Sequence, residues 1–345
     1  MNNKILYNQK NKKELIKILK EEKFKRVTLS FYRYVPLDNL LNLRNEMFIQ
    51  WRKLDILGRV YLAKEGINAQ ISIPKKLLNE FKKQLYSNEK FNGILFKKAY
   101  IEGKSFLKLT IKVKNEIVAY NIPENSCNME KVGNHLDYKQ FNQAIDDGAI
   151  VIDMRNYYES EVGKFENAII PDVDRSKELL PEIKKLLSGQ ENNTILMYCT
   201  GGIRCEKASS YLLKSGFKDI NQLKGGIVQY AHDIKKNQVK SKFIGKNFVF
   251  DYRMGEKITE DILSKCHICN NKSDAHTNCI NQACHILFIQ CNVCSRRYNG
   301  CCSEECSNFI KLEIKQQKEL FKSGKVKFNS QKSNNIKPKL SEINK

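Results

Sequence analysis

The chain has 345 residues, of which 41% are hydrophobic, and a formal net charge of +22. It contains no apolar run of about 18 residues, which excludes a membrane-spanning helix. Its lysine-rich N-terminus also lacks the apolar segment of a secretory signal, so we expect a cytoplasmic protein. This length suggests two or three domains. The excess of Lys and Arg favours a polyanionic partner, nucleic acid first, although genome base composition is another source of abundant lysine.

The first predicted module follows a basic segment over residues 1–24. Its strands are predicted over 27–35, 58–63, 68–73 and 106–113, and its helices over 37–54 and 74–85. The order strand, helix, strand, strand, helix, strand is that of a ferredoxin-like sandwich. We therefore assign residues 25–120 to a ferredoxin-like (acylphosphatase-like) α+β domain.

The second module follows a linker-like segment, residues 121–134, and is predicted over residues 135–240. Strands are predicted over 149–153, 194–198 and 220–223, with helices over 141–145, 178–187, 206–215 and 226–235. Alternating strands and helices with short connections favour a parallel α/β sheet. Function in such sheets lies at the carboxyl ends of strands, where Asp153 and Cys199 both fall.

The strongest local signal is the loop that follows the apolar strand at 194–198. Cys199 begins it, and Thr200, Gly201, Gly202, Ile203 and Arg204 follow before a helical pattern. Backbone N–H groups and the positive end of a helix dipole favour a thiolate, and Arg204 adds a positive charge. Such settings lower a cysteine pKa from about 8.5 to about 3.5–7.5. The alternative is a buried, inert cysteine at the end of a core strand.

The neighbours of this loop narrow its chemistry. Only four residues separate Cys199 from Arg204, whereas cysteine phosphatases need five to wrap a phosphate, so phosphatase activity ranks low. Cys205 is expected to pack or cap rather than react. Asp153 either orients the loop or pairs with Arg155, and Glu159 to Glu161 are expected to be solvated.

A third module, residues 241–310, is rich in cysteine. Nine of the twelve cysteines lie here, namely Cys266, Cys269, Cys279, Cys284, Cys291, Cys294, Cys301, Cys302 and Cys306. The two C-x2-C pairs, Cys266 with Cys269 and Cys291 with Cys294, each have the spacing of half a zinc site. The nine cysteines are enough for two tetrahedral zinc ions. An iron–sulfur centre and unmetallated thiols are the alternatives. The basic tail, residues 311–345, is expected to be partly disordered, above all near Asn334, Asn335 and Pro338.

Several motifs carry a resemblance to known proteins. Residues 151–155, 163–168, 199–204 and 225–227 resemble a rhodanese domain. Further motifs outside the rhodanese-like region extend the resemblance to the whole chain, at residues 65–69, 243–256, 276–279, 288–291 and 300–303. Together they resemble the bacterial tRNA uridine(34) hydroxylase family of rhodanese-related proteins.

That resemblance implies an oxidoreductase that converts the wobble uridine of tRNA to 5-hydroxyuridine, with molecular oxygen as co-substrate. Cys199 matches the family's essential cysteine, which is commonly described as forming a persulfide. The implied partner is the tRNA anticodon loop, whose bases can be splayed out and stacked on aromatic side chains. Phe31, Tyr32 and Tyr34 are candidates for stacking, unless they are simply core residues.

The mechanism at this stage is a hypothesis. Cys199 would add to C6 of the uracil and make C5 nucleophilic towards oxygen, or it would instead store sulfur or peroxide. No flavin, haem or facial-triad iron pattern is identifiable, so no organic cofactor is expected. The alternative function is a persulfide-forming sulfurtransferase that acts on tRNA or a carrier, and the third is a non-catalytic RNA-binding protein.

Overall fold

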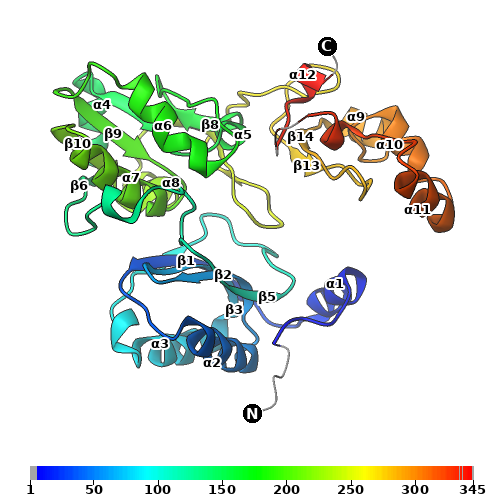
Figure 1. Ribbon diagram of the computed structural model, residues 1–345, viewed down its shortest axis with the longest axis horizontal. Helices are drawn as coiled ribbons and strands as arrows, with labels where there is room; N and C mark the ends of the chain where they lie inside the picture. Colours follow the sequence, from blue (N-terminus) through cyan, green and yellow to red (C-terminus); the bar gives the residue numbers. More distant parts are fainter. Residues whose placement is uncertain (1–5, 334, 336, 344–345) are drawn as a thin grey trace.

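The structure is a computed structural model that describes residues 6–333, 335 and 337–343. Figure 1 shows an N-terminal domain below, a central domain above it, and a C-terminal module beside the central domain. Within the described residues, every helix is too short or too polar to span a membrane.

The N-terminal domain is a five-stranded sheet covered on one face by two helices. The strand order is β4(Lys97–Lys98)-β1(Arg26–Tyr34)-β3(Gly66–Pro74)-β2(Leu57–Ala63)-β5(Leu109–Val113). The helices α2(Leu40–Lys53) and α3(Leu78–Tyr86) lie beneath it, and α1(Lys12–Glu21) lies at its side (Figure 1). Phe31, Trp51 and Phe81 meet in the core, and each is at most 1% exposed.

The fourth ferredoxin-like strand is not the one that the sequence predicts. The position beside β1 belongs to the two-residue strand β4, which is antiparallel to β1. The predicted strand at 106–113 begins only at Leu109, and as β5 it runs parallel to β2 at the opposite edge. Two consecutive lysines show no apolar alternation, so no local pattern marks β4. The ferredoxin-like order is thus present, with one strand added.

The second helical segment also begins later than predicted. Pro74 is the last residue of β3, and the short helix η1(Lys75–Leu77) leads into α3. Another such turn, η2(Glu89–Phe91), precedes β4, and η3(Glu124–Ser126) lies in the linker.

The central domain is built on the predicted parallel sheet. Its order is β6(Asn134–Leu136)-β10(Asp219–Leu223)-β9(Thr194–Tyr198)-β7(Ile150–Asp153), and all of its pairings are parallel. The helices α6(Ser176–Leu186) and α7(Ile203–Lys214) contribute to one apolar cluster, and α4(Tyr138–Asp146) and α8(Gly226–Asn237) to the other. The sheet is therefore covered on both faces, as parallel sheets require.

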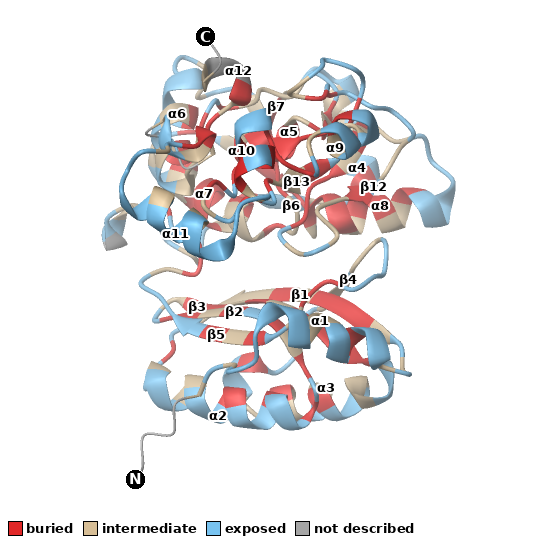
Figure 2. Cartoon of the chain, turned by 90° about the vertical axis from the view of Figure 1, so that its right-hand side faces the viewer, coloured by how far each residue is buried: buried red, intermediate tan, exposed pale blue. Residues whose placement is uncertain are grey.

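Short elements connect this domain to the C-terminal module. α5(Tyr157–Ser160) precedes β8(Gly163–Phe165), which pairs with β11(Phe243–Asn247), and β12(Glu256–Lys257) extends that ribbon. The module itself holds the hairpin β13(His276–Asn278) and β14(Leu287–Ile289), followed by α9(Asn292–Arg297) and α10(Glu304–Phe309). Figure 2 shows the module and the central domain together above the N-terminal sheet.

The described part of the tail, for which composition predicts partial disorder, forms short helical elements. After α11(Ile314–Lys322) and η4(Asn329–Gln331), the last described element is α12(Leu340–Ile343). Phe328 is fully buried and Leu340 is 1% exposed, in the same cluster as five of the cysteines. Pro338 is also buried, while Asn334 lies outside the described residues. A few apolar residues scattered among lysines give no periodic signal, which is why composition suggested disorder.

Candidate active site

Cys199 directly follows the end of β9, and α7 begins four residues later, at Ile203. Gly202 adopts a φ of 96° as the residue before that helix, so the loop turns sharply. The Gly202 N–H donates to Cys199 Sγ over 3.1 Å. Cys199 is 1% exposed, and it lines a cavity of about 910 Å³ between the central and N-terminal domains. The loop therefore presents a buried sulfur to the cavity between the domains.

The surroundings of Cys199 favour its thiolate. Burial alone would raise its pKa, but hydrogen bonds from Cys205, the charge of Arg204 and backbone N–H groups at the start of α7 outweigh burial. Together they lower the pKa of Cys199 to about 5. Cys205 is itself buried, and burial together with the neighbouring Cys199 raises its pKa well above the ordinary value. Cys205 thus stays a neutral donor to the reactive sulfur.

The start of α8 holds the loop from the other side. The Ile227 N–H donates to the Cys199 carbonyl over 3.0 Å, and the Val228 N–H to the Thr200 carbonyl over 3.2 Å. A side chain at Gly226 would place its Cβ only 2.6 Å from the Cys199 carbonyl oxygen. The close approach of the two helix starts therefore requires glycine at this position.

Arg204 is held by a partner that the sequence did not suggest. Its guanidinium forms a two-pronged pair with the Glu159 carboxylate at 2.6 and 2.8 Å, and also reaches Thr200 Oγ1 at 3.3 Å. Glu159 is fully buried and Ser160 is 4% exposed, so the expectation that these residues are solvated is wrong. A buried carboxylate is stable here because Arg204 neutralises it.

Asp153 pairs with Arg155 beneath the loop. The Arg155 guanidinium donates to both carboxylate oxygens, with 2.6 Å for the shortest contact, and neither residue is exposed. Ser160 and Tyr198 hydroxyls also donate to Asp153, each over 2.7 Å. This network ties β7 to β9 below the sulfur and does not line the cavity. Asp153 and Arg155 can support the loop but cannot touch a substrate there.

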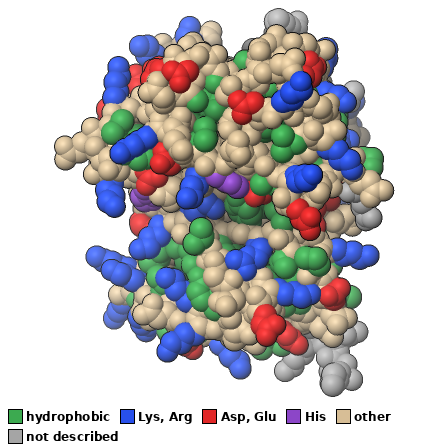
Figure 3. All heavy atoms as spheres, turned by 90° about the vertical axis from the view of Figure 1, so that its left-hand side faces the viewer, with side chains coloured by type: hydrophobic (Ala, Val, Ile, Leu, Met, Phe, Trp, Pro, Cys, Tyr) green, Lys and Arg blue, Asp and Glu red, His purple; other side chains and the backbone are tan. Residues whose placement is uncertain are grey.

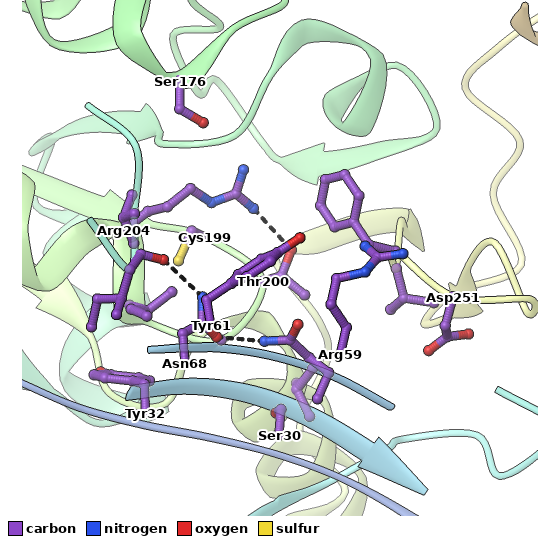
Figure 4. Close-up of a pocket in the computed structure, with 18 of the residues that line it drawn as sticks. Ser30, Tyr32, Arg59, Tyr61, Asn68, Ser176, Cys199, Thr200, Arg204 and Asp251 are labelled. Atoms are coloured by element: carbon purple, nitrogen blue, oxygen red, sulfur yellow. Dashed lines mark hydrogen bonds between the residues drawn. The ribbon is translucent and has the colours of Figure 1, made fainter. Parts of the chain in front are cut away.

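The opposite wall of the cavity is the open face of the N-terminal sheet. Figure 4 shows Tyr32, Arg59, Tyr61 and Asn68 rising from the strands towards the side on which Cys199, Thr200 and Arg204 lie. Of the three predicted stacking candidates, Phe31 and Tyr32 line the cavity, whereas Tyr34 does not. Phe31 is a core residue, and the Tyr34 hydroxyl donates to the Ile203 carbonyl over 3.3 Å.

Lys97 is a site residue that sequence reasoning missed. It lies on β4 and lines the cavity, with its ammonium 4.5 Å from the centre of the Tyr32 ring. Burial lowers the pKa of Lys97 to about 8, against the opposing pull of Cys199 and Glu206. No local signal marks it, because it faces Cys199 only through the packing of two domains.

The two domains are joined by ion pairs and hydrogen bonds at the start of α7. Lys207 pairs with Glu65 at 2.7 Å and with Glu116 at 3.0 Å. The Tyr120 hydroxyl donates to the Arg204 carbonyl over 3.0 Å. Glu65 belongs to the motif at 65–69, so that motif carries a domain contact. Figure 3 shows a hollow between the upper and lower halves, with Lys and Arg side chains around it.

A third segment closes the cavity. Phe250, Asp251, Arg253 and Glu256 line it from the motif at 243–256. Arg253 bridges Asp251 and Glu256 at 2.5 and 2.6 Å, and it also donates to the Ile101 carbonyl of the N-terminal domain.

The cysteine-rich module gathers its thiols into two groups of four. One holds Cys266, Cys269, Cys291 and Cys294, and the other Cys279, Cys284, Cys302 and Cys306. In the first group, Cys269 Sγ lies 3.6 Å from Cys291 Sγ. In the second, Cys302 Sγ lies 3.7 Å from Cys284 Sγ and 3.9 Å from Cys306 Sγ. Tetrahedral zinc with Zn–S bonds of about 2.3 Å requires S···S edges of about 3.8 Å, so both groups fit that ion.

Of the nine predicted cysteine ligands, Cys301 lies outside both groups. It is fully buried, and its carbonyl accepts a hydrogen bond from Gln290 over 2.9 Å. The next residue, Cys302, groups with Cys279 and Cys284. Cys306, four residues further along the chain, completes that group. Of the two adjacent cysteines, only Cys302 belongs to a group of four.

Family models match the chain in three successive segments. A UPF0176 acylphosphatase-like domain matches residues 26–117, a rhodanese-like domain residues 137–233, and a rhodanese C-terminal domain residues 244–307. A solved rhodanese-like domain from Anabaena sp. is 17% identical, covers 32% of this chain and 78% of that chain, and has a TM-score of 0.26.

Two curated relatives match over nearly the whole chain. A tRNA uridine(34) hydroxylase of Leptospira interrogans is 50% identical over 341 residues, 98% of this chain and 93% of its own length. A tRNA uridine(34) hydroxylase of Yersinia pestis is 45% identical over 317 residues, 91% of this chain and 89% of its own length.

Proposed function

The chain belongs to the tRNA uridine(34) hydroxylase family, and on that premise we propose how its own residues carry out the reaction. It is a tRNA-modifying enzyme that hydroxylates uridine 34. The observation that carries the proposal is the Cys199 thiolate, which faces a cavity of about 910 Å³ walled by a second domain. The sulfurtransferase alternative is not favoured, because the relatives that share the rhodanese domain are named as hydroxylases.

The part of the tRNA that enters the site is the anticodon loop. Its bases are unpaired, so extrusion of uridine 34 into the cavity costs little. The net charge of +22 favours the phosphate backbone around it. Lys177 and Arg59, both on the cavity, supply positive charge on its two walls.

The proposed chemistry starts with the thiolate. Cys199 Sγ forms a bond to C6, and the C5–C6 π pair moves towards C5 and O4. The Lys97 ammonium is placed to stabilise that negative charge. The thiolate is present at neutral pH because the pKa of Cys199 is about 5.

Dioxygen then supplies the hydroxyl oxygen. The C5 carbanion reacts with O2 and a proton to give a C5 hydroperoxide. An external two-electron donor and two protons reduce it to C5–OH and water. Loss of the C5 proton expels the Cys199 thiolate from C6 and restores the double bond. The sum is uridine, O2, two electrons and two protons to 5-hydroxyuridine and water.

The remaining groups act as supports. Glu159 orients Arg204, and the Asp153–Arg155 pair holds the strands below the loop. The two cysteine groups would each hold a structural zinc ion, which keeps the C-terminal module folded.

Nucleoside mass spectrometry tests the proposal. Purified protein is incubated with tRNA, a thiol reductant and isotopically labelled dioxygen, and we expect labelled 5-hydroxyuridine. The Cys199→Ser variant should give none, whereas Cys127→Ser, which changes a thiol outside the cavity, should match the parent. Full activity of Cys199→Ser, or product without label, would contradict the mechanism. A persulfide on the Cys199 peptide during turnover would favour sulfur storage instead.

A further inference from the structure

The open face of the N-terminal sheet carries an ordered array of side chains beneath Cys199. Strand register places Asn68 opposite Tyr32 on one side and Tyr61 on the other. The next row on the same face places Gln70 between Ser30 and Arg59. All six residues line the cavity (Figure 4). Two amides thus stand at the centre of the floor, with rings beside one of them and a cation beside the other.

Alternation along the strands separates this array from the core. Val60, Ala69 and Ile71, which are buried, point to the helices, whereas Arg59, Asn68 and Gln70 point the other way. The polar and aromatic residues on the face that packs towards another domain are not part of the hydrophobic core on the helical side of the sheet. Their placement requires another explanation, and a bound ligand supplies one.

The amides have unused hydrogen-bonding capacity. Asn68 Nδ2 donates to the Ile117 carbonyl over 3.1 Å, and Gln70 Nε2 donates to Asn68 Oδ1 over 2.5 Å. The second Nε2 hydrogen and Oε1 of Gln70 have no partner among the described residues. Within the same residues, the Arg59 guanidinium and the Tyr61 hydroxyl are likewise unpaired. The bond to Asn68 fixes the Gln70 amide, so it offers one donor and one acceptor side by side.

We propose that this array binds the uracil base of a single-stranded nucleotide and distinguishes it from cytosine. Gln70 accepts from uracil N3–H and donates to uracil O4, while Tyr61 provides a stacking surface and Arg59 binds a flanking phosphate. Cytosine presents an acceptor at N3 and an amino group at C4, so it leaves both Gln70 groups unpaired. The inference rests on the proposed function only in naming uridine 34 as that nucleotide.

Size and position agree with this assignment. The cavity of about 910 Å³ lies in the upper part of the range of about 300–1,000 Å³ that small-molecule sites occupy. It therefore accommodates a base with its ribose and phosphate. Because the Cys199 loop forms the opposite wall, a base on the sheet faces the sulfur across the cavity.

The test measures binding without turnover. Full-length Cys199→Ser protein is titrated with fluorescent anticodon stem-loops that differ only in U or C at position 34. We expect tighter binding of the U34 stem-loop. Gln70→Ala should weaken U34 binding about tenfold and remove the preference, because one bidentate base contact is worth roughly 1–3 kcal/mol. Tyr61→Ala should weaken both stem-loops.

A matched pair of arginines tests the phosphate contact. Arg59→Ala should weaken both stem-loops alike and reduce the salt dependence by about one unit of slope. Arg52→Ala removes the same charge from an exposed position on α2, on the helical side of the sheet, and should change neither. Because Arg59 is exposed, its removal leaves the fold intact.

Two results would overturn the inference. One is a Gln70→Ala variant, folded by thermal unfolding, that retains the parent's affinity and U34 preference. The other is equal effects of Arg59→Ala and Arg52→Ala. Failure of the proposed function has a different signature, because U34-selective binding would persist while the parent enzyme forms no 5-hydroxyuridine.

Discussion

At the scale of single residues, the site depends on the charged forms of Cys199 and Lys97. The pKa of each group is lowered from its ordinary value. Burial disfavours a thiolate, yet the donors at the start of α7 lower the pKa of Cys199 to about 5. Burial also disfavours an ammonium, and for Lys97 it prevails and lowers the pKa to about 8. A thiolate and an ammonium therefore coexist between these two values.

The activity should follow a bell-shaped pH profile. Below about pH 5 Cys199 becomes protonated and loses its nucleophilicity, and above about pH 8 Lys97 loses its charge. Measurement of kcat/KM for 5-hydroxyuridine formation from pH 4 to 10 checks both limbs.

Variants of Lys97 and alkylation of Cys199 test which group causes each limb of the pH profile. Lys97→Met should lower the plateau and abolish the alkaline limb, while Lys97→Arg, which stays charged, should retain activity above pH 8. The rate of iodoacetamide alkylation of Cys199, followed by peptide mass spectrometry, should titrate near pH 5. An alkylation midpoint near pH 8.5 would show that the thiolate is not stabilised.

At the scale of elements, two helix starts meet at the Cys199 loop. The start of α7 supplies donors to the sulfur, and the start of α8 supplies donors to the carbonyls behind it. This arrangement requires Gly226, which has a φ of 69° and no room for a Cβ. Gly201 in the same loop has open space around it.

These two glycines give a matched prediction. Gly226→Ala should lower the free energy of unfolding by about 1–3 kcal/mol and displace the loop, because both the conformation and the contact are unfavourable. Gly201→Ala should leave the unfolding temperature unchanged. Thermal unfolding and the pKa of Cys199 by alkylation measure the two effects. Equal stability of both variants would mean that α8 does not press on the loop.

In the cysteine-rich module, the fold decides which candidate metal ligands come together. Each proposed ion takes cysteines from two separate pairs, and Cys302 is a ligand candidate whereas Cys301 is not. Local spacing identifies the pairs but leaves the choice between adjacent cysteines open.

Metal analysis distinguishes the two cysteines. The parent should contain two zinc ions per chain, Cys302→Ser one, and Cys301→Ser two. Loss of an ion should lower the unfolding temperature of the module, because zinc binding contributes directly to folding. Loss of zinc from Cys301→Ser, or its retention in Cys302→Ser, would contradict the grouping.

At the scale of the whole molecule, the site exists only because two domains meet. One wall is the Cys199 loop and the other is the N-terminal sheet, and Lys207 pairs across the boundary with Glu65 and Glu116. The Lys207 side chain is 8% exposed, so its removal would leave two carboxylates facing each other without their cation.

Lys207→Ala should therefore loosen the domain contact. We expect faster proteolysis in the segment 121–134 and a several-fold rise in KM for tRNA, with zinc content unchanged. Lys83→Ala, which removes a charge from the exposed side of α3, serves as control. Unchanged proteolysis and KM would show that other contacts are sufficient to hold the domains together.

The sequence by itself determined what depends on near neighbours in the chain. The strand predicted at 27–35 corresponds to β1, and an apolar run marked β9. The C-x2-C spacing marked two pairs of candidate metal ligands, and the Gly-Gly-x-Arg pattern marked the candidate Cys199 loop. Each of these signals spans a few residues, because strand periodicity and helix starts are local properties of the backbone.

Tertiary structure alone decided which distant groups meet. Glu159 reaches Arg204 across 45 residues, Lys97 comes from a strand too short to show a pattern, and Cys302 rather than Cys301 joins its group. Charged groups and metal ligands that are distant in the sequence come together only when whole helices and strands pack. That packing depends on the apolar surface that many residues bury together. For this reason the reactive sulfur was visible in the sequence, while the surface opposite it became visible only in the fold.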